Sequence, residues 1–122
     1  MNKPETMMID NIKYVREDSV KSKAPELDGM RYVLVRTYSA GCFTGYLKSK
    51  TGQEVVLLKA RRLWYWDGAS SLSQLAMEGV KKPQTCKFPC EVDRIELLHA
   101  IEILDVTDVA KKSIDGVRVW NQ

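Results

Sequence analysis

Closely spaced strand-like segments, separated by turn signals, dominate the middle of this chain of 122 residues. β-Branched and aromatic residues fill residues 32–38, 42–48 and 54–66, with turn residues at 39–41 and 50–52 between them. Strands about ten residues apart that are joined by short turns are typical of an antiparallel meander. In the first segment, apolar side chains fall on both faces, so we expect both faces of the sheet to be covered.

A short helix is predicted directly after these strands. Ser71 and Gln74 have the spacing of a capping box, and Gly79 stands where a glycine commonly ends a helix. Between them, three apolar residues at i, i+3 and i+4 form one face. These local signals indicate a single short helix that packs by one side.

The last third of the chain contains further strand-like sequence and a second helix. Residues 87–106 have the strand pattern, although 97–101 could also be read as a helix. Thr107 can cap a helix that runs to about Ser113, with lysines in its last turn, where cations interact favourably with the helix dipole. Gly116 ends this helix, and the residues after it predict a short closing strand.

The first 30 residues differ from the rest, because they are polar and of mixed charge, with one short apolar run at 12–15. We therefore predict a partly ordered N-terminal arm with one strand at 1–30, followed by a single domain at 31–122. The expected fold class is α+β, with an antiparallel sheet of about five strands and two short helices.

Positive charge is concentrated in the strand region. Residues 31–62 hold seven basic side chains and one acid, Glu54, so this segment carries +6, twice the +3 of the whole chain. Such a run favours an anionic ligand or partner, although a solvated surface explains it equally well.

The sequence has no membrane span, no secretory signal and no recognisable set of metal ligands. No apolar stretch approaches the ~18 residues that span a bilayer, and the first 30 residues lack the apolar core of a secretory signal, so we expect a cytoplasmic protein without a membrane partner. Three cysteines, Cys42, Cys86 and Cys90, argue against a disulfide framework. With a single histidine and no second cysteine pair, neither a metal nor a cofactor is expected.

The strongest functional signal is the run from Lys59 to Trp66, which mixes cations with aromatic rings. In a strand, Arg62, Trp64 and Trp66 share one face, and each face pairs a cation with an aromatic ring. The opposite face would hold Lys59, Arg61, Leu63 and Tyr65. Guanidinium groups bind phosphates and indoles stack on bases, so the run favours a nucleotide over a sugar or a lipid.

The helix that begins at Ser70 or Ser71 offers a second phosphate contact, through free N–H groups and the positive end of its dipole. The alternative is that the tryptophans are core residues, the arginines are solvated and Ser71 only caps its helix. Two weaker cation–aromatic pairs are Arg36 with Tyr38 and Arg118 with Trp120, and Trp120 could equally pack on a partner subunit. The predicted ligand-binding residues are Arg36, Arg61, Arg62, Trp64, Ser70, Ser71, Phe88 and Arg118.

A catalytic role has little support in the sequence. His99 lies among apolar residues, which favours a packed imidazole over a general base. There is no phosphate-binding glycine loop and no dinucleotide fingerprint. No catalytic residue is predicted, and a protein that binds its ligand without converting it is the simpler interpretation.

Three stretches, 32–41, 60–76 and 112–120, resemble the small phage and prophage proteins grouped with the first type of Thoeris anti-defence protein, and the similarity covers about residues 30–122. It implies a sponge that binds cyclic ADP-ribose isomers made by bacterial TIR-domain immune enzymes and sequesters them without cleavage. Some proteins of this type also bind cyclic di- or trinucleotides from the cGAS-like defence pathway.

The resemblance further implies a homo-oligomer, either a dimer or a trimer of dimers, with pockets at the subunit interfaces. The alternative function is a single-stranded nucleic-acid-binding β-module, which would use the basic segment for the backbone and the tryptophans for the bases. Both functions need arginines beside aromatic rings, so the sequence alone leaves both open.

Overall fold

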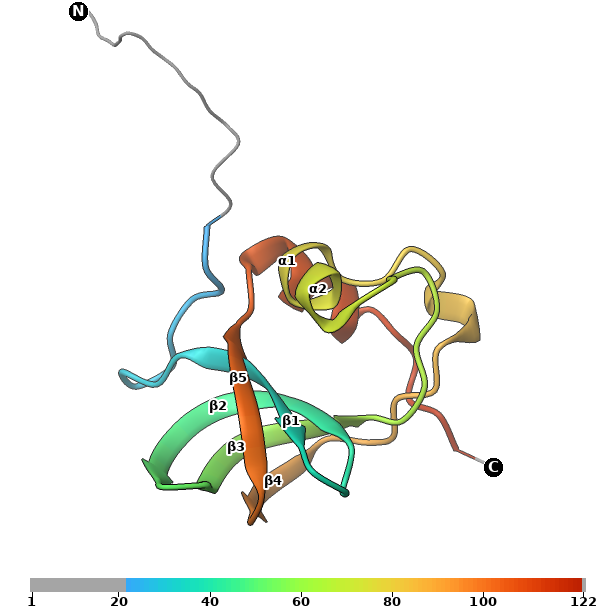
Figure 1. Cartoon of the computed structure of the whole chain (residues 1–122). Helices are drawn as coiled ribbons and strands as arrows, with labels where there is room; N and C mark the ends of the chain where they lie inside the picture. The colour runs from blue at the N-terminus through green and yellow to red at the C-terminus, as the bar shows by residue number, and fades with distance from the viewer. Residues whose placement is uncertain (1–21, 122) are drawn as a thin grey trace, which may run out of the picture.

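A computed structural model describes residues 22–121 and contains one antiparallel sheet with two helices (Figure 1). The expected α+β class is therefore confirmed. None of the helices among these residues is long and apolar enough to cross a membrane. In chain order, the elements are β1 (Tyr32–Thr37), β2 (Cys42–Thr51), β3 (Glu54–Leu63), α1 (Leu72–Glu78), a single 3-10 turn η1 (Pro83–Thr85), β4 (Val92–Leu97), β5 (Ala100–Asp105) and α2 (Asp108–Asp115).

The sheet curls until its two ends meet. Its strand order is β4-β3-β2-β1-β5, so the consecutive strands β4 and β5 lie at opposite ends. Leu97 of β4 pairs with Val55 of β3, whereas Ala100 of β5 pairs with Thr37 of β1. Because only residues 98 and 99 separate these two positions, a tight turn joins the two ends of the sheet, although β4 and β5 do not pair with each other. The region 97–101 therefore folds as two strand ends and a turn rather than a helix.

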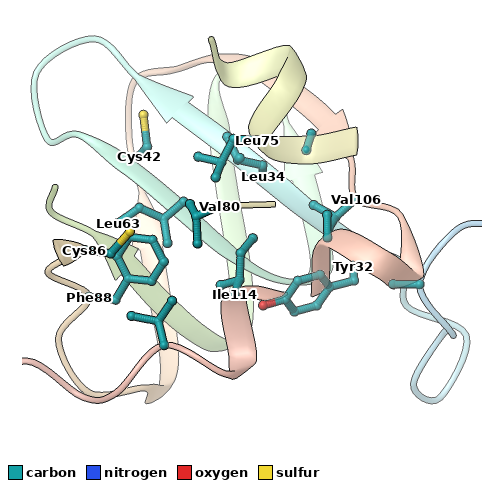
Figure 2. Packing of buried hydrophobic residues seen from close by; sticks show 14 residues of the cluster. Tyr32, Leu34, Cys42, Leu63, Leu75, Val80, Cys86, Phe88, Val106 and Ile114 are labelled. Carbon is teal, nitrogen blue, oxygen red and sulfur yellow. The ribbon is translucent and has the colours of Figure 1, made fainter. Parts of the chain in front are cut away.

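Alternation along β1 sends side chains into two separate cores, as expected for a sheet covered on both faces. Val33 and Val35 lie in the concave core, inside the curl, with Phe43 and other residues of β2–β5. Leu34 lies in the outer core, between the sheet and the helices, where Figure 2 shows it with Leu75 of α1 and residues of α2. Figure 1 shows both helices on this one side of the sheet.

Both helix starts follow the predicted capping. The hydroxyl oxygen of Ser71 accepts a hydrogen bond from the N–H of Gln74 (3.1 Å), and Gly79 ends α1 with a φ of 78°. The hydroxyl of Thr107 accepts one from the N–H of Ala110 (3.1 Å) and donates one to the carbonyl of Met77 at the end of α1 (2.7 Å). This second bond ties the two helices together, and α2 continues to Asp115, two residues beyond the predicted end.

A bulge in β3 changes which side chains share a face. Lys59 has a φ of 50°, and the pairing with β2 shifts between Tyr46–Leu58 and Thr44–Arg61. The extra residue reverses the alternation, because two residues of β3 then oppose one of β2. As a result, Arg61 faces the outer core and Arg62 faces the concave side, where its guanidinium lies over the ring of a buried phenylalanine.

Two predicted strand ends are shorter than expected. β3 ends at Leu63 rather than near residue 66, and beyond it Tyr65 forms an isolated bridge with Lys87. The predicted closing strand is reduced to a single parallel bridge between Phe88 and Val119. Through these two bridges, the segments around residues 65, 87–88 and 119 lie side by side without forming a regular sheet.

The end of the predicted N-terminal arm that lies within the described residues packs on the domain. Lys23 bridges Thr107, and the N–H of Ala24 donates to the carbonyl of Val106 (2.9 Å). Ala24 is buried in the outer core. The apolar run at 12–15, where a strand was predicted, lies outside the described residues.

Candidate ligand-binding site

Arg61 is a buried structural residue, so the expectation that it lies exposed to an anion is wrong. Its side chain is 8% exposed, and it donates hydrogen bonds to four backbone carbonyls at 2.9–3.2 Å. Its guanidinium also lies over the ring of Phe88, 5.4 Å from the centre, and burial lowers its pKa. The four acceptors belong to Phe88, Pro89, Ile114 and Val117. Arg61 therefore holds the end of α2 and the C-terminal tail against residues 88–89.

Three other predicted residues are also committed to the fold. Phe88 is fully buried in the outer core, so it cannot stack on a ligand. The N–H and the hydroxyl of Ser70 both donate to the side-chain oxygen of Gln74 (2.9 and 2.7 Å), and Ser71 caps α1. The side-chain hydroxyls of both serines are thus engaged within the helix start, so they are not free to bind a phosphate.

Some arginines form ion pairs with acidic side chains and others do not. Arg36 forms an ion pair with Glu102 (3.0 Å) on the sheet surface. Arg31 bonds to Asp105 and thereby holds the pKa of that carboxyl below its usual range. Among the arginines of residues 22–121, only the three at 61, 62 and 118 form no ion pair. Because Arg61 is occupied by carbonyls, Arg62 and Arg118 are the arginines of this part of the chain whose charge is neither paired with an acid nor buried.

Arg62 lies at the open end of the concave core. Its guanidinium carbon is 4.6 Å from the centre of the Phe43 ring, and one N–H donates to the carbonyl of Ala40 at 3.3 Å. Trp64, two residues further along an extended segment, is 62% exposed. Both residues are thus exposed, but the guanidinium lies over Phe43 rather than over the indole, and neither described pocket includes either residue.

A hollow of about 490 Å³ lies between η1 and the C-terminal tail. Its size falls within the range of small-ligand sites, which runs from about 300 to 1,000 Å³. Arg118 and Trp120 both line it, so one of the two weaker cation–aromatic pairs is the one that the fold places in a cavity. The lining residues are Pro83, Gln84, Cys86, Gly116, Arg118, Val119, Trp120 and Asn121.

Lys87 connects this hollow to the run that gave the strongest sequence signal. The backbones of Tyr65 and Lys87 exchange two hydrogen bonds (3.1 and 2.7 Å). The Lys87 ammonium then lies 5.9 Å from the centre of the Tyr65 ring and 5.8 Å from that of the Trp120 ring. The sequence did not mark Lys87 as a candidate site residue, because a single lysine cannot be told from any other surface lysine until the chain folds.

The walls of the hollow are fixed by backbone contacts. The N–H of Trp120 donates to the carbonyl of Phe88 (2.9 Å), and Arg61 holds the carbonyl of Val117 (2.9 Å). The Cys86 sulfur accepts from the N–H of Asp67 (3.4 Å). A cavity with anchored walls loses little conformational entropy when a ligand binds, which favours affinity.

The remaining candidates for chemistry lie apart from the hollow. His99 is exposed in the turn between β4 and β5, so the expectation that it is packed is wrong; its backbone carbonyl accepts from the N–H of Tyr38 (2.9 Å). Cys86 is buried whereas Cys90 is exposed. Within residues 22–121, no three histidine, cysteine or acidic side chains come together as metal ligands would.

Comparison with known proteins places the chain in a family. The family described as a domain of unknown function, DUF6948, matches residues 30–114. No curated protein and no solved structure matches. The matched residues include all five strands and helix α1, whereas the tail that lines the hollow follows them. Because the match covers well over half of its 122 residues, the chain belongs to the DUF6948 family.

Proposed function

We propose that this protein binds a nucleotide in the C-terminal hollow and sequesters it without cleaving it. The observation that carries the proposal is the placement of Arg118 and Trp120 in one cavity, with the Lys87 ammonium against the Trp120 ring. A guanidinium and an ammonium suit phosphate oxygens, and an indole suits a base, through stacking worth ~1–3 kcal/mol.

The nucleotide we propose is a cyclic immune signal, either a cyclic ADP-ribose isomer or a cyclic di- or trinucleotide. This follows from the resemblance to Thoeris anti-defence proteins, under which the protein acts in the cytoplasm of a bacterial host of a phage. A sponge must lower the free signal appreciably, so we expect a Kd below about 1 μM, or about −8 kcal/mol. We also propose a homo-oligomer, in which a neighbouring subunit would enclose the hollow further.

Binding without conversion is supported by how Asp67 is used. This carboxylate, which lies directly after the Lys59–Trp66 run, accepts hydrogen bonds from the N–H of Gly68 (2.8 Å) and the hydroxyl of Thr85 (3.1 Å). Both bonds hold the loop beside η1 in shape. A general base needs free reach to its substrate's proton, and these bonds reduce that reach.

Native mass spectrometry with a panel of cyclic nucleotides tests the proposal, since it reports the ligand and the stoichiometry together. We expect the wild-type protein to retain one class of cyclic nucleotide, and Trp120→Ala or Arg118→Gln to bind it about tenfold or more weakly. Arg36→Gln is the matched control, because that arginine is paired with Glu102 away from the hollow.

The chemical state of the bound ligand separates a sponge from an enzyme. After incubation with excess protein, the complex is isolated and heat-denatured, and the released ligand is analysed. Intact ligand supports sequestration. Linear products that accumulate with time and disappear in Asp67→Asn, Glu91→Gln or Asp93→Asn would overturn it, as would retention of no nucleotide at all.

Single-stranded nucleic acid is the second candidate, and the exposure of Trp64 and Tyr65 (62% and 50%) favours it. Lys87 lies over the Tyr65 ring, so these exposed rings extend the cation–aromatic surface beyond the hollow. Salt dependence distinguishes the two candidates. A polymer that contacts several phosphates gives a log–log slope of about −0.7 per phosphate, whereas a small ligand in a cavity gives a shallower one.

A further inference from the structure

Lys87 is the middle member of three short segments that lie side by side. On one side its backbone is hydrogen-bonded twice to Tyr65, and on the other side Phe88 bridges Val119 and receives the N–H of Trp120. Backbone pairing therefore fixes the base of the Lys87 side chain between two aromatic residues. Its position does not depend on a flexible loop.

The charge of Lys87 has no acidic partner among residues 22–121. Other cations of this part of the chain, such as Lys111 and Lys112, are paired with Asp115 and Asp108. The Lys87 ammonium instead contacts only the two ring faces, at 5.9 and 5.8 Å from their centres. Lys87 and Tyr65 do not themselves line the hollow, but Trp120 does, so the ammonium covers part of a ring on which a base would stack and keeps a positive charge beside the hollow.

We infer that Lys87 makes the hollow selective for phosphorylated ligands. In the free protein its ammonium occupies the faces of Tyr65 and Trp120, and a neutral base must displace it without compensation. A phosphate draws the ammonium into an ion pair and uncovers the rings at the same time. The same side chain thus disfavours a nucleoside and favours a nucleotide. The inference rests on the proposed function, because it requires a base to stack in this hollow.

The experiment compares adenosine 5′-monophosphate with adenosine, using the indole N–H signal of Trp120 in NMR titrations of the full chain. Lys87→Met removes the charge but keeps an unbranched apolar side chain. An exposed cation–π contact is worth about a two- to fivefold change in an equilibrium constant. We therefore expect Lys87→Met to bind adenosine two- to fivefold more tightly and the monophosphate about tenfold more weakly. Lys48→Met, on β2, is the control and should change neither affinity.

Opposite shifts of the two affinities support the inference. If Lys87→Met weakens both ligands, or leaves adenosine unchanged, Lys87 does not compete with the base and the inference is wrong, while nucleotide binding itself stands. If neither ligand shifts the Trp120 signal of the wild-type protein and the cyclic nucleotides are not retained either, the proposed function fails first. A circular dichroism melt that matches the wild type shows that the variant is folded.

Discussion

Arg61 and Arg62 are neighbours in β3, yet they lie in two contrasting regions of the molecule. Arg61 faces α2 and the C-terminal tail, where it is 8% exposed and donates to four backbone carbonyls. Arg62 faces the open end of the concave core, where it covers the Phe43 ring and makes one long hydrogen bond to a carbonyl. Arg61 is therefore a buried residue that holds backbone segments together, whereas Arg62 is a surface cation.

This difference shows that the hydrogen-bond acceptors around an arginine decide whether it stabilises the fold or remains available to a ligand. Segments that meet without regular strand pairing, such as the end of α2 and the tail, leave carbonyls that need donors. A guanidinium offers five donors in one plane and can serve several of them at once. Around Arg62, water is available to do this, so that side chain contributes little to the fold and is free to meet a ligand.

The largest effect should come from Arg61→Met. Removal of the guanidinium leaves buried carbonyls without donors, and we expect the free energy of unfolding to fall by about 3 kcal/mol. Arg62→Met should cost less than about 1 kcal/mol, because its site is open to water. Urea denaturation of both variants measures the two values. Equal losses would show that the contrast between the two regions is mistaken.

The second effect concerns Tyr32, which shares the outer core with Arg61. Burial raises the pKa of Tyr32 to about 12, from an ordinary value of 10.0, and its hydroxyl donates to Thr44 (3.0 Å). Because the folded state disfavours the phenolate, stability is fully present below pH 10 and is lost as the pH rises towards 12. The loss should reach roughly 2 kcal/mol.

Urea denaturation at several pH values between 8 and 11 follows this loss. Tyr32→Phe should lower stability at pH 8, since Thr44 loses its partner, and should remove part of the decline above pH 10. Tyr38→Phe is the control, because Tyr38 is 79% exposed and lies outside both cores. A decline of the same steepness in wild type and Tyr32→Phe would contradict this account.

A smaller effect should come from the cap of α2. Thr107→Ala removes a bond to the Ala110 N–H and another to the Met77 carbonyl, and Thr107 is buried. We expect a loss of about 1–2 kcal/mol, whereas Ser71→Ala at the exposed start of α1 should cost about 1 kcal/mol or less. Thermal melts monitored by circular dichroism compare them. If Thr107→Ser fails to restore most of the loss, packing of the methyl group matters more than the two bonds.

The smallest effect should come from Arg36→Gln. Its ion pair with Glu102 is exposed, and pairs of this kind are worth about 0–1 kcal/mol. We also expect nucleotide affinity to stay within about twofold, because Arg36 does not line the hollow and its charge is already paired. Calorimetric titration checks this, and a tenfold loss of affinity would move the site to the Arg36 end of the sheet.

Much of the fold was predictable from the sequence because its signals are local. The cap at Ser71, the glycine at Gly79 and the cap at Thr107 act within one helical turn, so their spacing alone indicates where each helix begins or ends. The alternating apolar residues of β1 predicted a sheet covered on both faces, and both cores are present. Arg118 and Trp120, a cation–aromatic pair in the sequence, also line one hollow, and their shared ligand stays a prediction.

The roles of individual site residues depended on the tertiary structure. The bulge at Lys59 reversed the faces of Arg61 and Arg62, and no spacing rule in the sequence marks it. The carbonyls that bury Arg61 and the rings that hold Lys87 come from residues far away in the chain, such as Val117 and Trp120. Local pattern can indicate that a cation stands beside an aromatic ring. Which acceptors face that cation is set only when distant segments pack, because their carbonyls and rings have no fixed position before then.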